Sequence, residues 1–135
     1  MASRNYKYYQ PNKKDLKDKC GDCSIRALTM FFDCTWLEAF DMLVSYARET
    51  QQMLNALPNI KLLMEDKKVP YTSIYEPRVK NKETVDSFAK SHKKGVYILY
   101  VRVGFNTHLV CVKDGIYYDT WDCGSRIVYG YWVKE

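Results

Sequence analysis

One cysteine of this chain is placed where a thiol becomes a nucleophile. Cys23 directly follows Asp22, a credible helix N-cap, so it falls in the first turn of a predicted helix. A free thiol has a pKa of about 8.5, and the dipole of a helix N-terminus favours the reactive thiolate. A neighbouring imidazole completes the activation by forming a thiolate–imidazolium pair. We therefore predict that Cys23 is a catalytic nucleophile.

The chain has two histidines, and their surroundings distinguish them. His92 lies in the cationic run 90–94, which we expect to be exposed and which does not suit a general base. His108 opens the apolar stretch 108–112, which is typical of a strand. We expect His108 at the edge of a sheet with a partly shielded ring, and we predict that it is the base for Cys23.

A catalytic imidazole also needs an acceptor that orients it, and the next hairpin offers two carboxylates. If Asp114 and Gly115 form a two-residue turn, Asp119 lies diagonal to His108 on the same face of the hairpin. If the turn has three residues, Asp122 becomes the carboxylate on that face. Asp119 is the first choice, and Asp122 stays open as the alternative.

Hydrophobic periodicity predicts helices in the first two thirds of the chain. The first begins near Asp22 and runs to about Phe32. A capping box of Thr35 and Glu38 opens the second helix. Pro58 suits the first turn of a third, and residues 84–90 form a short fourth.

Strand patterns dominate the remainder of the chain. After a short strand at 71–75, β-branched and aromatic residues predict strands at 96–103, 108–112, 116–120 and 127–133. Helices followed by an antiparallel meander predict an α+β fold with the helices packed on one side of the sheet. We expect residues 1–19 to be a polar tail and residues 20–135 to form a single domain.

The composition favours a soluble protein of one domain. The chain has 135 residues, of which 47% are hydrophobic, enough for a core. No stretch approaches the roughly 18 apolar residues that span a bilayer, and no apolar segment resembles a signal peptide, so we expect the cytoplasm. The net charge of +5 is spread over separate runs rather than one stripe, so we expect no nucleic acid partner.

The five cysteines allow two readings besides catalysis. Cys20 and Cys23 form a C-x-x-C, but the redox version of this motif normally follows a strand, and the segment before Cys20 is charged. The same pair could bind zinc with His108 and either Cys111 or Cys123, but a second close pair of ligands is missing. An odd count without a signal peptide argues against a disulfide framework.

Three short blocks together resemble the papain-like cysteine peptidases. Residues 20–24, Cys-Gly-Asp-Cys-Ser, resemble the Cys-Gly-Ser-Cys-Trp motif around the papain nucleophile, with Cys23 in its place. Residues 108–110, His-Leu-Val, resemble the His-Ala-Val that starts the strand of the papain base. Residues 118–121, Tyr-Asp-Thr-Trp, resemble the Asn-Ser-Trp stretch, with Asp119 for the asparagine and Trp121 for the shielding tryptophan. In size the chain is similar to the compact bacterial and phage members.

The resemblance implies a cysteine hydrolase, a peptidase or amidase acting on a peptide or peptide-like substrate without a cofactor or metal. Cys23 would form a thioester, His108 would move the proton and Asp119 would orient the imidazole. The chain departs from papain at Lys17, which stands where papain has its oxyanion glutamine. That departure keeps a second reading open, a non-catalytic binding or inhibitor protein on a papain-like fold.

Overall fold

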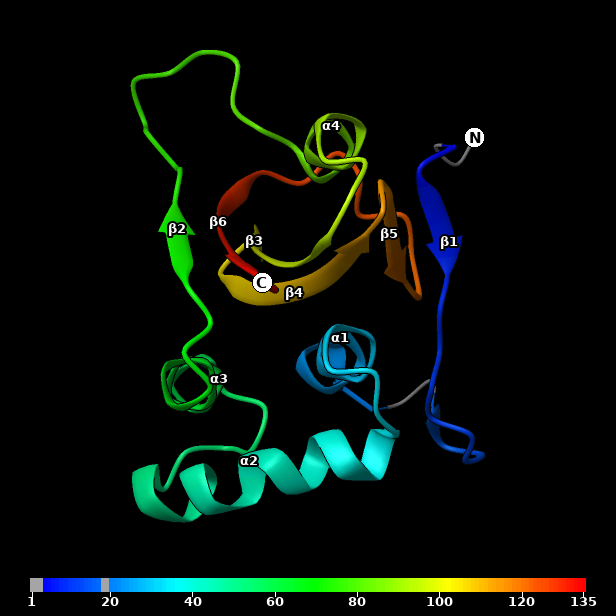
Figure 1. Ribbon diagram of the computed structural model, residues 1–135, viewed down its shortest axis with the longest axis vertical. Coiled ribbons are helices and arrows are strands. Elements are labelled where there is room, and N and C mark those ends of the chain that lie inside the picture. Colours follow the sequence, from blue (N-terminus) through cyan, green and yellow to red (C-terminus); the bar gives the residue numbers. More distant parts are fainter. Residues whose placement is uncertain (1–3, 18–19) are drawn as a thin grey trace.

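A six-stranded mixed sheet forms the centre of the protein. The computed structural model describes residues 4–17 and 20–135, and within them the strand order is β1-β5-β4-β3-β6-β2 (Figure 1). Every neighbouring pair is antiparallel except β1 and β5, which run parallel. The strands are β1 (Tyr6–Tyr8), β2 (Tyr71–Ser73), β3 (Val96–Val103), β4 (Asn106–Lys113), β5 (Ile116–Asp119) and β6 (Val128–Val133).

The four helices of the described residues cover both faces of the sheet. They are α1 (Cys23–Phe31), α2 (Trp36–Thr50), α3 (Leu57–Asp66) and α4 (Val85–Ser91). Helices α1, α2 and α3 lie on one face and α4 lies on the other (Figure 1). The predicted α+β class is confirmed, but the expectation that all helices pack on one side is wrong for α4. Val110 and Val112 of β4 are apolar on the second face too, and Phe88 of α4 buries them there.

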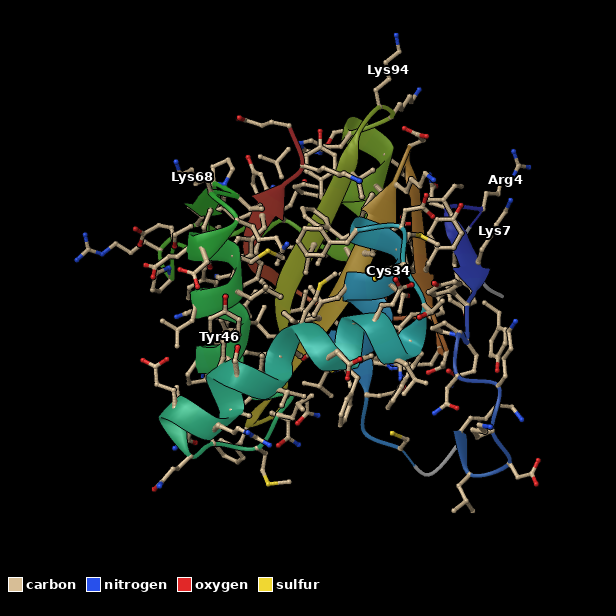
Figure 2. All side chains as sticks on the ribbon, turned by 60° about the horizontal axis from the view of Figure 1, so that its bottom comes forward. Arg4, Lys7, Cys34, Tyr46, Lys68 and Lys94 are labelled. Atoms are coloured by element: carbon tan, nitrogen blue, oxygen red, sulfur yellow. The ribbon has the colours of Figure 1, made fainter. Side chains whose placement is uncertain are left out.

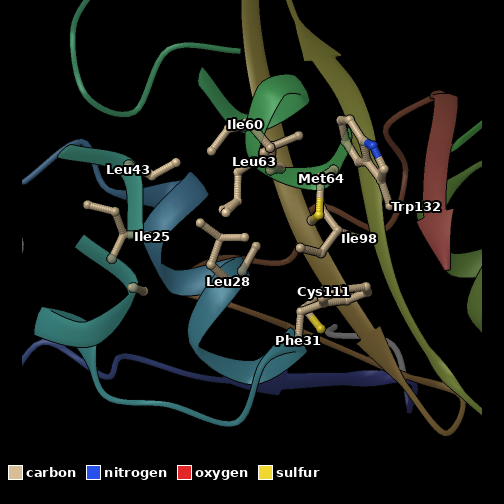
Figure 3. Packing of buried hydrophobic residues seen from close by; sticks show 13 residues of the cluster. Ile25, Leu28, Phe31, Leu43, Ile60, Leu63, Met64, Ile98, Cys111 and Trp132 are labelled. Atoms are coloured by element: carbon tan, nitrogen blue, oxygen red, sulfur yellow. The ribbon is translucent and has the colours of Figure 1, made fainter. Parts of the chain in front are cut away.

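Helix α1 lies at the centre of the larger core. Its apolar side chains recur at helical spacing and meet the sheet on one side and α2 and α3 on the other (Figure 3). Leu28 and Phe31 have no exposed surface. The residues that surround these two are Leu43 of α2, Ile60, Leu63 and Met64 of α3, and Ile98, Cys111 and Trp132 of the sheet.

The N-terminal segment is more ordered than the predicted polar tail. Tyr6–Tyr8 form β1 beside β5, with Tyr6 paired to Tyr117, and the Asn5 carbonyl accepts the Tyr117 N–H (2.7 Å). The Tyr9 hydroxyl shares a hydrogen bond with Thr29 of α1 (2.6 Å). Residues 1–3 and 18–19 of the predicted tail lie outside the described residues. A strand of three residues is too short to give a periodic signal, which explains why the sequence did not predict it.

Local capping chemistry fixes where helix α2 begins. The Thr35 Oγ1 accepts the Glu38 N–H (3.1 Å), and the Glu38 Oε1 accepts the Thr35 N–H (2.9 Å). The predicted capping box is therefore confirmed. The helix crosses the outer side of α1 (Figure 2). Its Tyr46 hydroxyl donates to Asp66 of α3 (2.5 Å). None of the helices in the described parts of the chain combines the length and the apolar character that crossing a bilayer requires.

Truncation of Leu28 tests the central role of α1. We expect Leu28→Ala to lower the free energy of unfolding by about 2–5 kcal/mol, because it leaves a cavity in a closed core. Leu37→Ala is the matched control, since Leu37 lies on α2 with 65% of its surface exposed, and it should change the value by less than about 0.5 kcal/mol. Denaturant unfolding measures both, and similar losses for the two variants would contradict this core assignment.

Candidate active site

Cys23 is the first residue of α1, as the sequence predicts. Asp22 is the N-cap residue, but its side chain makes no capping hydrogen bond. The Asp22 carbonyl accepts the Arg26 N–H (2.9 Å), which is the first bond of the helical ladder. The dipole of this helix N-terminus therefore acts directly on the half-buried Cys23 side chain.

Two groups of β4 contact the sulfur of Cys23. The His108 ring and the Leu109 N–H lie close enough to the Cys23 sulfur to favour its thiolate form. The register between β4 and β5 covers Cys111 to Lys113, so the two strands are no longer paired at His108, where the N-terminus of α1 meets β4. The structure thus brings together the cysteine and the histidine predicted from the sequence.

The β4–β5 hairpin decides between the two candidate carboxylates. Lys113 pairs with Ile116, so Asp114 and Gly115 form the two-residue turn, both with positive φ (51° and 83°). In this register Asp119 lies on the face of His108, and its Oδ2 accepts a hydrogen bond from His108 Nε2 (2.5 Å). Because Nε2 is bound to Asp119, Nδ1 is the ring nitrogen left for Cys23.

Asp122, the alternative carboxylate, belongs to a different group of residues. Its Oδ1 accepts a hydrogen bond from the Tyr117 hydroxyl and another from the Gly124 N–H (3.0 Å). Asp122 is exposed, whereas Asp119 is buried. The orienting partner of His108 is therefore Asp119, the first choice from the sequence.

The pKa values of Cys23 and His108 move in opposite directions. Burial would raise the pKa of the Cys23 thiol, but the hydrogen bond and positive charge of His108 outweigh burial and lower it. For His108 burial acts in the other direction and would lower the pKa, but the interactions of the ring with Asp119 and Cys23 raise it to about 9. Both shifts favour a thiolate beside an imidazolium at neutral pH.

Two charged residues extend the site beneath Asp119: Arg26, which the sequence did not single out, and Asp22, which the sequence indicated only as a helix cap. Arg26 donates through one guanidinium nitrogen to Asp119 Oδ1 (3.1 Å) and through the other to Asp22. Asp22 also accepts a hydrogen bond from the Trp36 indole of α2 (2.8 Å). The available signal was an arginine four residues after an aspartate on a helix with no other charged residue, since a buried arginine requires acidic partners.

The Trp121 ring packs beside the imidazole of His108. Its ring centroid lies 5.2 Å from that of His108, at an interplanar angle of 46°. The Arg126 guanidinium lies 5.6 Å from the centroid of the Trp121 ring. Trp121, the tryptophan of the third block that resembles papain, therefore lies beside the base His108.

The second histidine is not as exposed as the sequence suggested. His92 is half-buried, stacks on Phe88 (3.7 Å between centroids) and shares a hydrogen bond through Nδ1 with the Phe88 carbonyl (2.8 Å). The expectation that His92 is exposed is therefore wrong. The reason is that α4 packs Phe88 onto the sheet and carries His92 with it.

Part of the zinc set considered from the sequence also comes together. The donor atoms of His108, Asp119 and Cys123 lie within 4.8 Å of one another, whereas Cys111 is in the α1 core (Figure 3) and Cys20 is exposed. Burial and the charge of Asp119 raise the pKa of Cys123 well above its ordinary range, so this thiol stays protonated. The positive charges of Arg26 and the His108 imidazolium, both beside Asp119, would also repel a metal cation at this position. These features argue against a metal site.

Comparisons with protein-family models, with curated proteins and with solved structures find no match to this chain. The resemblance to papain-like peptidases therefore remains a prediction from the sequence.

Titration of His108 tests the electrostatics of this site. We expect NMR to give a midpoint of about 9 for His108, and Asp119→Asn to lower that midpoint because it removes the hydrogen-bonded anion. Asp122→Asn is the matched control, an identical change three residues away, and should leave the midpoint in place. A wild-type midpoint at the ordinary value of about 6.5 would contradict the geometry.

Proposed function

We propose that the protein is a cysteine hydrolase that cleaves an amide-type bond in a peptide or peptide-like substrate. The observation that carries the proposal is the placement of Cys23, at the N-terminus of α1, beside His108, whose Nε2 is hydrogen-bonded to Asp119. A nucleophile, its base and an orienting acid in contact are the arrangement that acyl transfer requires. The Asp-to-His distance of 2.5 Å fixes which ring nitrogen faces the thiol.

The first half of the reaction forms a thioester. The Cys23 thiolate attacks the substrate carbonyl carbon, and a carbon–sulfur bond forms. The His108 imidazolium then gives its proton to the leaving nitrogen as the carbon–nitrogen bond breaks. Asp119 holds the ring in the orientation that serves both steps.

The second half releases the acyl group with water. His108, now neutral, takes a proton from a water molecule whose oxygen attacks the thioester carbonyl. The carbon–sulfur bond breaks, the acid leaves, and the thiolate–imidazolium pair is restored. Both halves use the side chains of this chain, the substrate and water.

The negative oxygen that forms during each attack needs a hydrogen-bond donor. The backbone N–H of Cys23 lies at the helix N-terminus, where the first N–H groups have no acceptor within the helical ladder. It is therefore the donor that we propose for the oxyanion. Lys17, in place of the papain glutamine, is the candidate for a second donor.

Thiol alkylation tests whether Cys23 is activated. We expect iodoacetamide at pH 6 to modify Cys23 first, because only a thiolate reacts and His108 keeps this one ionised. Cys20 is an internal control, since it is accessible to the reagent while partial desolvation and the charge of Asp22 raise the pKa of its thiol. His108→Ala should slow the modification of Cys23 by about tenfold or more, which corresponds to one unit of thiol pKa. Peptide mapping by mass spectrometry measures both sites.

The same experiment separates the hydrolase from the alternative on a papain-like fold. If Cys23 reacts no faster than Cys20 in the wild-type protein, the chain has no activated nucleophile. That outcome would favour the non-catalytic binding or inhibitor protein.

An activated ester tests the acyl transfer itself. With p-nitrophenyl acetate we expect a burst of nitrophenolate, acetylation of Cys23 and slow turnover, because the thioester forms faster than water removes it. Cys23→Ala should abolish the burst. Cys34→Ala is the matched control, because Cys34 is half-buried in the connection between α1 and α2. A burst that survives in Cys23→Ala would contradict the assignment of the nucleophile.

A further inference from the structure

Arg26 occupies a position that links the helix of the nucleophile to the carboxylate of the base. It lies three residues after Cys23 in α1, and its side chain is almost completely buried. Its guanidinium contacts Asp22 on its own helix and Asp119 on β5. No step of the proposed reaction requires Arg26 to touch the substrate.

We propose that Arg26 is a positioning residue, which acts through Asp119 to aim the carboxylate at His108 and to keep the thiolate–imidazolium pair formed. This inference rests on the proposed cysteine hydrolase. Asp22, which accepts a hydrogen bond from the Trp36 indole, holds Arg26 in turn.

The two oxygens of Asp119 have separate partners, and this division supports the positioning role. Oδ1 accepts the Arg26 guanidinium (3.1 Å) and the Thr120 N–H (2.7 Å), so the carboxylate is fixed at one end. Oδ2 is thereby directed to His108 Nε2. A carboxylate held only by its own backbone could rotate about its side-chain torsions and leave the imidazole.

The charges of these residues alternate in sign from one contact to the next. The order is Asp22, Arg26, Asp119, His108 and Cys23, that is anion, cation, anion, cation and anion when the pair is ionised. Each inner charge therefore has an opposite charge on both sides, which lowers the cost of burial. The Arg26 charge also acts on Cys23 directly and favours the thiolate.

Asp22 keeps the guanidinium in place from the opposite side. Its carboxylate is buried and receives the Trp36 indole N–H (2.8 Å) in addition to Arg26. The fork of an arginine can contact two carboxylates at once, whereas a lysine ammonium is a single point charge. The geometry therefore uses the shape of the arginine as well as its charge.

The pH dependence of Cys23 alkylation depends on a small set of groups. The titratable and charged side chains that face the Cys23–His108 pair or its direct partners come from β1, α1, β4, β5 and the segments that flank them. They are Cys20, Asp22, Arg26, His108, Asp119 and Cys123, together with Tyr6 of β1, whose hydroxyl donates to the Asp119 carbonyl.

The test measures the rate of iodoacetamide reaction at Cys23 from pH 4 to pH 10. We expect Arg26→Met to move the acid limb of this profile up by about one unit, which is about a tenfold slower reaction at a pH below the limb. Arg26→Lys should move it less, because the charge remains but the bridge between two carboxylates is lost. Arg48→Met, the identical change at an exposed position of α2, should leave the profile as in the wild type.

Asp22→Asn gives the sharpest control, because we expect its effect to have the opposite sign. Removing this anion leaves more of the Arg26 charge to act on Cys23, so the acid limb should move down. A merely structural role for the buried network would slow the reaction in both variants without opposite displacements of the limb. If Arg26→Met does not fold, as circular dichroism would show, Arg26→Lys and Asp22→Asn still decide the question.

The outcomes distinguish this inference from the proposed function. If wild-type Cys23 reacts no faster than Cys20, the hydrolase fails and the inference fails with it. If wild-type Cys23 reacts fast but Arg26→Met and Arg26→Lys keep the wild-type profile, the hydrolase stands and the positioning role is wrong. A downward limb in Asp22→Asn together with an upward limb in Arg26→Met supports the role.

Discussion

A buried guanidinium–carboxylate contact ties α1 to the sheet, and the geometry around Cys23 depends on it. Arg26 on the helix and Asp119 on β5 are both buried, with nitrogen and oxygen 3.1 Å apart. Neither charge is stable there alone, so each fixes the position of the other. The helix therefore cannot slide or rotate along β4 without separating an ion pair from which water is excluded. That constraint holds Cys23, one turn earlier, against His108.

The surroundings of α1 show how a helix buried on nearly all sides accommodates polar groups. Ser24 donates to the Asn55 carbonyl (3.1 Å), and Thr29 donates to the Arg26 carbonyl (2.6 Å). In the described residues, no buried side-chain nitrogen or oxygen lacks a hydrogen-bond partner. Each polar residue on this buried helix thus fixes one neighbouring group through a hydrogen bond, while the apolar residues supply most of the favourable free energy of folding.

The parts of the site that the sequence could predict are those governed by local rules. The dipeptide Asp114-Gly115 suits a two-residue turn with positive φ at both positions, and this local preference made Asp119 the first choice. The observed register then selects Asp119 over Asp122. The capping pair Thr35 and Glu38 fixes the start of α2 in the same local way. The parts that could not be predicted depend on partners distant in the chain. The acid that Arg26 would meet on the sheet, the parallel pairing of β1 with β5 and the face chosen by α4 carry no local signal.

The charged row beneath Cys23 is not what stability alone would select. Replacing a buried ion pair with apolar side chains of similar volume is often neutral or stabilising, because desolvation offsets much of the attraction. The rest of the α1 core follows that rule, with Leu28 and Phe31 against Ile98. Charges are concentrated at the one end of the helix where a thiolate would sit, and there an apolar core would favour the neutral thiol and the neutral imidazole. The buried charges therefore replace apolar packing at the site where ionised groups are chemically useful. For this reason we interpret the row of charges as part of a reactive site rather than as core packing.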